Sequence, residues 1–168
     1  YGTAALSWVF RHAPIPWGIL LRCSVELILH LYGIRYGSLV IDDSDKKRSK
    51  NTTKIWHTHK LKDKASGGFV MGQGLVFMVL VTPTITLPVG IEFYMPDPDY
   101  SAWKKADNKL KKKKVPARQR PSKPAKNDEF PKKVEIAIRL VEQFHACFPG
   151  IGVKCIIADA LYGTEEFF

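Results

Sequence analysis

The sequence predicts an α/β domain built on a mixed sheet, in which an antiparallel hairpin accompanies parallel strands joined by a crossover helix. Three observations predict this class. Two short, mostly apolar runs, residues 38–41 and 153–158, are each followed directly by an aspartate. A longer apolar run, residues 69–91, contains two prolines, as expected of two strands and a turn. A helical pattern precedes the last run, and a helix in that place allows the flanking strands to lie parallel.

The N-terminal part, residues 1–36, is predicted to be a helical segment preceding the main domain, residues 37–168. Apolar side chains recur at spacings of three and four over residues 17–36, which is typical of a helix with one buried face. Gly33 and Gly37 are expected to end that helix. Residues 38–41 then read as a strand that is apolar on both faces, as in a strand buried on both sides of a sheet.

The run from residue 69 to residue 91 contains no charged side chain and is long enough to span a bilayer. Its composition favours strands instead, because it is rich in Val, Ile and Thr and contains Pro83 and Pro88. We therefore expect two strands, about 70–81 and 85–95, joined at residues 82–84. No membrane association is expected.

The positive charge lies in one part of the chain. The formal net charge is +10, and the segment from Lys104 to Lys126 holds eleven Lys or Arg residues against the single Asp107. Outside this segment, basic and acidic residues are equal in number. Because so polar a stretch cannot bury enough apolar surface to fold alone, residues 104–128 are predicted to be a flexible basic loop.

The last elements are a predicted helix over residues 131–148 and a short buried strand over residues 153–158. The helix has apolar side chains at i, i+3, i+4 and i+7 and is followed by Pro149 and Gly150. The strand delivers Asp159. If it lies parallel to the strand before Asp42, the two aspartates come side by side.

Paired carboxylates at neighbouring strand ends suit metal-dependent phosphodiester chemistry. Two divalent ions can activate an attacking oxygen and stabilise a leaving one. Mg²⁺ prefers oxygen ligands, so aspartates on rigid strands are natural holders. The structural alternative is that Asp42 and Asp159 are turn formers or helix caps, which are frequent uses of Asp after a strand.

Three stretches of the chain resemble the DDE-type transposases of bacterial insertion sequences, of the insertion-sequence-four-like kind. Leu39-Val40-Ile41-Asp42-Asp43-Ser44 looks like their first-aspartate motif, although Ser44 stands where Thr is common. Ile156-Ile157-Ala158-Asp159-Ala160-Leu161-Tyr162-Gly163 resembles the second. Between them, residues 85–96 are similar to the family's third strand, with its Leu-Pro and Tyr-x-Pro. The resemblance covers roughly residues 37–168.

The resemblance implies an incomplete RNase H-like domain that cuts and joins transposon ends with Mg²⁺ or Mn²⁺. It assigns the catalytic and metal-binding roles to Asp42 and Asp159, and Asp43 is expected to be structural because it alternates with Asp42 along the strand. Double-stranded DNA would be the partner, with a homo-oligomer on the DNA possible. The family's glutamate has no match, since Glu165 and Glu166 follow Asp159 too closely. We therefore expect this fragment to be inactive alone.

Two basic stretches are candidate DNA contacts. One follows Asp42 directly, over residues 46–64, and includes Trp56, His57 and His59; the other is the loop. Such segments track phosphates and stack bases. The alternatives are a solvated charged hairpin and a basic tail that only raises solubility. Zinc at His57 and His59 is not expected without further ligands. The DNA-binding candidates are Lys46, Lys47, Arg48, Lys50, Lys111, Lys112, Lys113 and Lys114.

Three cysteines without a C-x-x-C pair suit a reducing compartment, and no secretory signal opens the chain. A bacterial cytoplasmic, nucleoid-associated protein is expected. The chain begins with Tyr1 and ends on residues 164–168, which look like the start of an element, so we expect a fragment. Two other functions stay open: a non-catalytic nucleic-acid-binding relic of a decayed element, and an RNase H-like nuclease unconnected with transposition.

Overall fold

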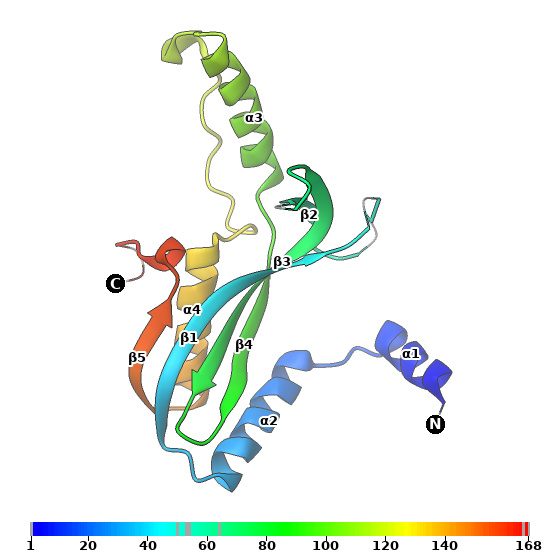
Figure 1. Ribbon diagram of the computed structural model, residues 1–168, viewed down its shortest axis with the longest axis vertical. Coiled ribbons are helices and arrows are strands. Elements are labelled where there is room, and N and C mark those ends of the chain that lie inside the picture. Colours follow the sequence, from blue (N-terminus) through cyan, green and yellow to red (C-terminus); the bar gives the residue numbers. More distant parts are fainter. Residues whose placement is uncertain (1, 50, 53–54, 64, 166, 168) are drawn as a thin grey trace.

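The computed structural model describes residues 2–49, 51–52, 55–63, 65–165 and 167. Within them the strands form one five-stranded mixed sheet, which confirms the predicted α/β class (Figure 1). The elements in chain order are α1 (Thr3–His12), α2 (Trp17–Leu31), β1 (Tyr36–Lys47), β2 (His59–Lys62), β3 (Phe69–Val81), β4 (Thr86–Tyr94), α3 (Pro98–Lys112), the 3-10 turn η1 (Ala117–Gln119), α4 (Lys133–Cys147), β5 (Gly152–Ala158) and the 3-10 turn η2 (Ala160–Tyr162).

Strand β1 lies between β3 and β5. It pairs antiparallel with β3 from Ser38 to Lys47, and parallel with β5 as far as Ile41 opposite Ala158. The predicted parallel pairing of the first and last strands is therefore confirmed. Strand β3 also pairs antiparallel with β4 and, near its start, with the short β2, so the predicted hairpin is confirmed as well.

The core lies on the side of the sheet that faces helices α2 and α4. Along β1 and β3, fully buried side chains alternate with partly exposed ones, as expected when one face of a sheet is covered. Helix α4, which was predicted, packs its apolar stripe against the buried set, and α2 adds two residues. The core includes Leu39, Ile41, Val76, Met78, Leu80, Ile136, Ala137, Leu140, Phe144, Val25 and Leu29.

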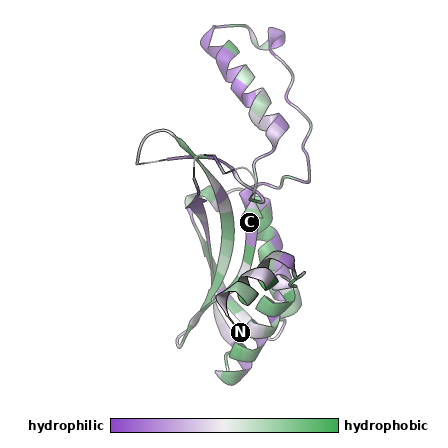
Figure 2. Cartoon of the chain, turned by 90° about the vertical axis from the view of Figure 1, so that its right-hand side faces the viewer, coloured by the Kyte–Doolittle hydropathy of each residue, from purple (hydrophilic) through white to green (hydrophobic). Residues whose placement is uncertain are grey.

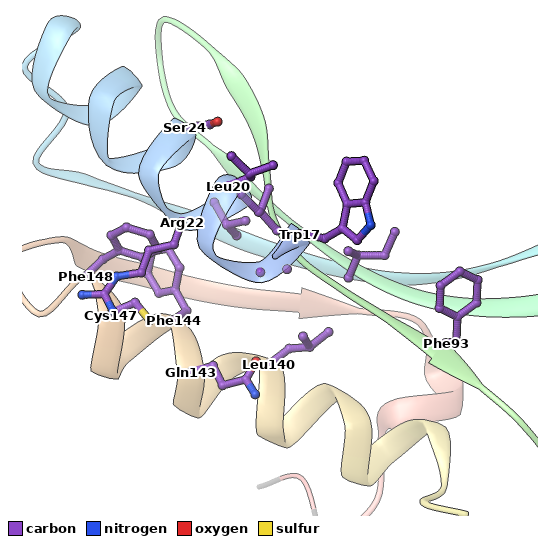
Figure 3. Close-up of a pocket in the computed structure, with 15 residues that line it drawn as sticks. Trp17, Leu20, Arg22, Ser24, Phe93, Leu140, Gln143, Phe144, Cys147 and Phe148 are labelled. Carbon is purple, nitrogen blue, oxygen red and sulfur yellow. The ribbon is translucent and has the colours of Figure 1, made fainter. Parts of the chain in front are cut away.

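Helices α2 and α4 and strand β4 surround an apolar hollow of about 720 Å³ (Figure 3). Trp17 and Leu20 line it from α2, Phe93 from β4, and Leu140 and Phe148 from the region of α4. Its lining includes no Asp or Glu, so it is separate from the aspartates singled out by the sequence.

Two strand predictions need correction. Strand β1 does not end at Asp42 but continues to Lys47, because β3 supplies backbone partners all the way to Gly72 opposite Lys47. Strand β5 was expected to be buried, yet Ile156 and Ile157 are 40% and 53% exposed. Within the described residues β5 pairs only with β1 and is an edge strand, so its outer side has no neighbour.

Helix α2 ends at Leu31, earlier than the predicted residue 36. Gly33 stops it, as expected, by adopting a left-handed conformation with φ of 59°. The amide of Ile34 then donates to the carbonyl oxygen of Leu29 at 2.9 Å, closing the helix end. The chain is thereby turned into β1.

The prediction of a flexible loop over residues 104–128 was wrong for its first part, since α3 continues to Lys112. Asp97 caps this helix by accepting from the amides of Asp99 and Tyr100, and Pro98 occupies the first turn. Lys is also a good helix former. Helix α3 and the returning segment, residues 98–131, form a mostly hydrophilic projection that we call the basic arm (Figures 1 and 2).

No helix among the described residues has the length and apolar character needed to cross a membrane.

Candidate metal and nucleic-acid site

Asp42 and Asp159 lie next to each other at one edge of the sheet. The pairing of β1 with β5 ends at Ile41 and Ala158; Asp42 is the next residue within β1, and Asp159 directly follows β5. Both line a polar hollow of about 440 Å³, together with Asp43, Asp45 and Lys62. Both also line a second, shallower hollow beside Val40 and Ile157. The topology therefore brings together the two residues on which the sequence prediction depended.

Each of these carboxylates is oriented by its own backbone. Oδ1 of Asp42 accepts from the amide of Asp43 at 2.8 Å, and Oδ1 of Asp159 accepts from the amide of Ala160 at 2.6 Å. Asp159 is thus also the cap of η2, which is the structural role considered above. The second oxygen of each carboxylate has no hydrogen bond or ion pair with the described residues, and both side chains are exposed.

Asp43 has a different environment from Asp42. Its carboxylate forms an ion pair with Nζ of Lys133 at the start of α4, and both side chains are largely covered. The Lys133 ammonium also lies over the ring of Tyr94, 5.3 Å from its centroid. Asp43 is therefore engaged in joining the sheet to α4, in keeping with the structural role expected for it.

Tyr162, three residues after Asp159, was not given a role from the sequence. Its side chain is completely buried, and its hydroxyl has no hydrogen-bond partner among the described residues. Burial raises the pKa of Tyr162, and the negative charges of Asp43, Asp42 and Asp159 raise it further. The hydroxyl therefore stays protonated next to the carboxylate group.

The donor chemistry at this edge suits a hard divalent cation. Carboxylate oxygens that have no partner among the described residues are the kind of ligand that Mg²⁺ and Mn²⁺ accept, with water completing the shell. A cluster of three or more acidic, His or Cys side chains placed to hold a metal is not found among the described residues. Asp42 and Asp159 could thus supply part of a metal site.

Some side chains of the first basic stretch, residues 46–64, form contacts within the protein. Lys47 forms an ion pair with Asp63, and this hydrogen bond, with a second from Ser66, lowers the pKa of Asp63. The Arg48 guanidinium donates twice to Oε1 of the buried Gln73, at 2.8 and 3.2 Å. Lys46 is exposed. The fourth candidate, Lys50, lies outside the described residues.

Gln73 also holds the turn that carries Trp56. Its Nε2 donates to the carbonyl oxygen of Trp56 at 2.8 Å, and the exposed indole packs edge-on against Phe93. Burial and the nearby His59 lower the pKa of His57. Neither histidine belongs to a group of three or more potential metal ligands among the described residues. The turn instead presents the exposed Trp56 side chain within the basic stretch, residues 46–64.

The lysines expected to contact DNA in the loop lie at the far end of the basic arm. All four are exposed, and Lys111 also forms an ion pair with Asp107, at 2.7 Å. Helix α3 ends within this run, which suits its dipole because cations are favourable at a helix C-terminus. The structure thus places all four residues at the tip of a projection, Lys111 and Lys112 in the last turn of α3 and Lys113 and Lys114 in the turn that follows it.

Comparison of the chain with models of protein families, with curated proteins and with solved structures gave no match.

Proposed function

We propose that this chain is part of the catalytic domain of a DDE-type DNA transposase with an RNase H-like fold. The observation that carries the proposal is the parallel pairing of β1 with β5, which ends immediately before Asp42 and Asp159. The two motifs that resemble the family's aspartate motifs are 117 positions apart in the chain. Their meeting at one sheet edge is what a shared catalytic site requires.

Asp42 and Asp159 would hold Mg²⁺ or Mn²⁺ through the oxygens that have no partner among the described residues. A divalent ion bound there would activate the attacking oxygen and stabilise the leaving oxygen of a phosphodiester. The protein's own contribution is positioning: the sheet fixes the two backbones, and the amides of Asp43 and Ala160 fix the two carboxylates. Lys46 and the exposed Trp56 are suited to holding a DNA strand next to this edge.

A second candidate is a nucleic-acid-binding protein without catalysis. It is favoured by the lack, among the described residues, of a third acidic side chain close enough to complete a metal cluster. The exposed cations of the basic arm are compatible with both functions. Measurements of metal binding and of DNA cleavage distinguish the two candidate functions.

Mn²⁺ binding measured by electron paramagnetic resonance tests the site in this chain. We expect weak binding that disappears in both Asp42→Asn and Asp159→Asn and persists in Asp45→Asn. For the activity, a plasmid carrying the element's ends is incubated with Mg²⁺ and a protein that extends to the family's glutamate. Binding that survives both substitutions, or an extended protein that binds DNA but never cleaves it, contradicts the transposase and supports the second candidate.

A further inference from the structure

Helix α3 of the basic arm has two chemically distinct faces. Trp103, Asp107 and Leu110 follow one another at spacings of four and three, which places them on one side of the helix. All three are at least partly covered, and Asp107 is only 5% exposed. A buried carboxylate in so basic a segment needs partners. This side of the helix is the one packed against the returning segment.

The returning segment is fastened to this face by specific contacts. Nε1 of Trp103 donates to the carbonyl oxygen of Pro121 at 2.9 Å. Nη1 of Arg120 donates to Oδ1 of Asp107 at 2.8 Å, and Nζ of Lys111 lies 2.7 Å from Oδ2. Hydrogen bonding from Lys111 and the charge of Arg120 lower the pKa of Asp107. Oδ1 thus joins the helix to the returning segment, whereas Oδ2 pairs with a lysine one turn further along the same helix.

The opposite face carries a stripe of lysines. Lys105, Lys109 and Lys112 also recur at spacings of four and three, about half a turn away from Asp107 around the helix. All three are exposed and have no side-chain hydrogen bond or ion pair within the part of the chain that the structure describes. They span about 10 Å along the helix axis, at 1.5 Å per residue. Lys113 and Lys114 continue this positive surface at the tip.

We propose that this lysine stripe is a preformed contact surface for the sugar-phosphate backbone of duplex DNA, held in shape by Asp107. The proposal rests on the proposed function in taking DNA as the partner. Duplex DNA presents about one negative charge per 1.7 Å of axis, so a stripe of this length faces several phosphates. The stripe has no aromatic side chain for stacking on unpaired bases and no large apolar side chain to anchor a protein.

Asp107 distinguishes a built surface from a flexible charged tail. In a flexible tail Asp107 only reduces the positive charge, so its removal would tighten DNA binding. In a built arm its removal breaks the contacts with Arg120 and Lys111 and leaves the returning segment held through Trp103, so the stripe loses part of its fixed geometry. Binding then requires ordering of the arm, which costs affinity. The flexible tail and the built arm therefore predict changes of opposite sign in DNA affinity when Asp107 is replaced.

Lys114 offers the complementary test. It has a left-handed conformation with φ of 57°, which favours glycine. Lys114→Gly therefore removes one charge while relaxing the backbone of the arm. We expect the arm to stay folded and the salt dependence of DNA binding to decrease by about one phosphate contact.

The experiment measures binding of the whole chain to two unrelated 20-base-pair duplexes by fluorescence anisotropy, in EDTA, over a range of salt concentrations. We expect the triple variant Lys105→Ala, Lys109→Ala, Lys112→Ala to bind roughly tenfold or more weakly and to lower the salt slope by about 2.7. The control variant Arg22→Ala, Arg35→Ala, Lys154→Ala removes the same charge from outside the basic arm. It should bind the duplexes nearly as tightly as the parent chain. Asp107→Ala should bind about threefold more weakly.

Hydrogen exchange of the α3 amides reports separately whether each variant keeps the arm folded. Equal losses in the two triple variants, or an Asp107→Ala protein that binds more tightly than the parent, would overturn the proposal. If the lysine-stripe variant binds DNA weakly, the control triple variant binds normally and no metal binds at Asp42, the arm proposal stands and the proposed catalysis fails. If the parent chain binds neither duplex, the arm proposal falls whatever the metal result.

Discussion

The carboxylate of Asp43 and the ammonium of Lys133 form an ion pair across ninety positions of the chain, joining β1 to the first turn of α4. The pair lies next to Asp42, and the ring of Tyr94 covers the ammonium. It therefore links the packing of α4 on the sheet to the position of the candidate metal ligands.

This ion pair should contribute to stability. Because both side chains are about one-fifth exposed, Asp43→Ala or Lys133→Ala should lower the free energy of unfolding by about 1–2 kcal/mol. A double-mutant cycle in urea should give a coupling of roughly 1 kcal/mol. The exposed pair Lys126–Asp128 is the control and should give a coupling near zero. Equal couplings for the two pairs would show that the position of Asp43 matters little.

Asp42→Asn and Asp159→Asn should abolish metal binding and, in a protein that includes the third acidic residue, DNA cleavage and strand transfer. Each substitution keeps the side chain's shape but removes the charge that an oxygen-ligated cation needs. Folding should be unchanged or slightly more stable, since neighbouring carboxylates repel one another without metal. Asp43→Asn should bind metal normally and lose only stability. Cleavage that survives in Asp42→Asn but is lost in Asp43→Asn would show that the ligand is Asp43.

Tyr162→Phe should stabilise the protein by up to about 1 kcal/mol, because it removes a buried hydroxyl that lacks a partner among the described residues. The pH dependence follows from the raised pKa of Tyr162. Below pH 10 both folded and unfolded states keep the proton. Above pH 10 the unfolded state releases it first, so stability falls as the pH rises towards the folded-state pKa.

The Phe variant lacks this contribution, so its stability advantage should grow between pH 9 and pH 11 in urea titrations, on the order of 1 kcal/mol. A constant difference between the two proteins over that range would mean that the Tyr162 hydroxyl is solvated.

Replacement of Lys111, Lys112, Lys113 and Lys114 by Ala should weaken binding to every duplex alike and decrease the salt slope. These side chains lie at the tip of the arm. They can contact DNA phosphates there, but they are not held in fixed positions against base edges. Filter binding to several duplexes at three salt concentrations measures both effects. A loss confined to one DNA sequence would show that the tip reads bases.

The apolar patterns determined most of the sheet. Residues 69–91 predicted a hairpin, and the stripe of α4 followed by Asp159 predicted a crossover to a strand parallel to β1. Local periodicity and turn residues are sufficient to predict such strands and helices, because each element buries one face and so shows a regular apolar pattern. The resemblance of two short motifs further singled out Asp42 and Asp159 as a pair.

The rest depended on contacts between residues distant in the chain. Strand β1 is longer than predicted because it pairs with β3 as far as Lys47. Charged residues such as Lys47 give no indication in the sequence that the strand continues. The exposure of β5 came from its edge position. The folding back of the basic arm on itself involves contacts of Asp107 with Arg120, thirteen residues away, and of Trp103 with Pro121. A lysine-rich sequence predicts a solvated loop, whereas only the tertiary structure shows a buried carboxylate among these charges, in contact with a cation from the returning segment.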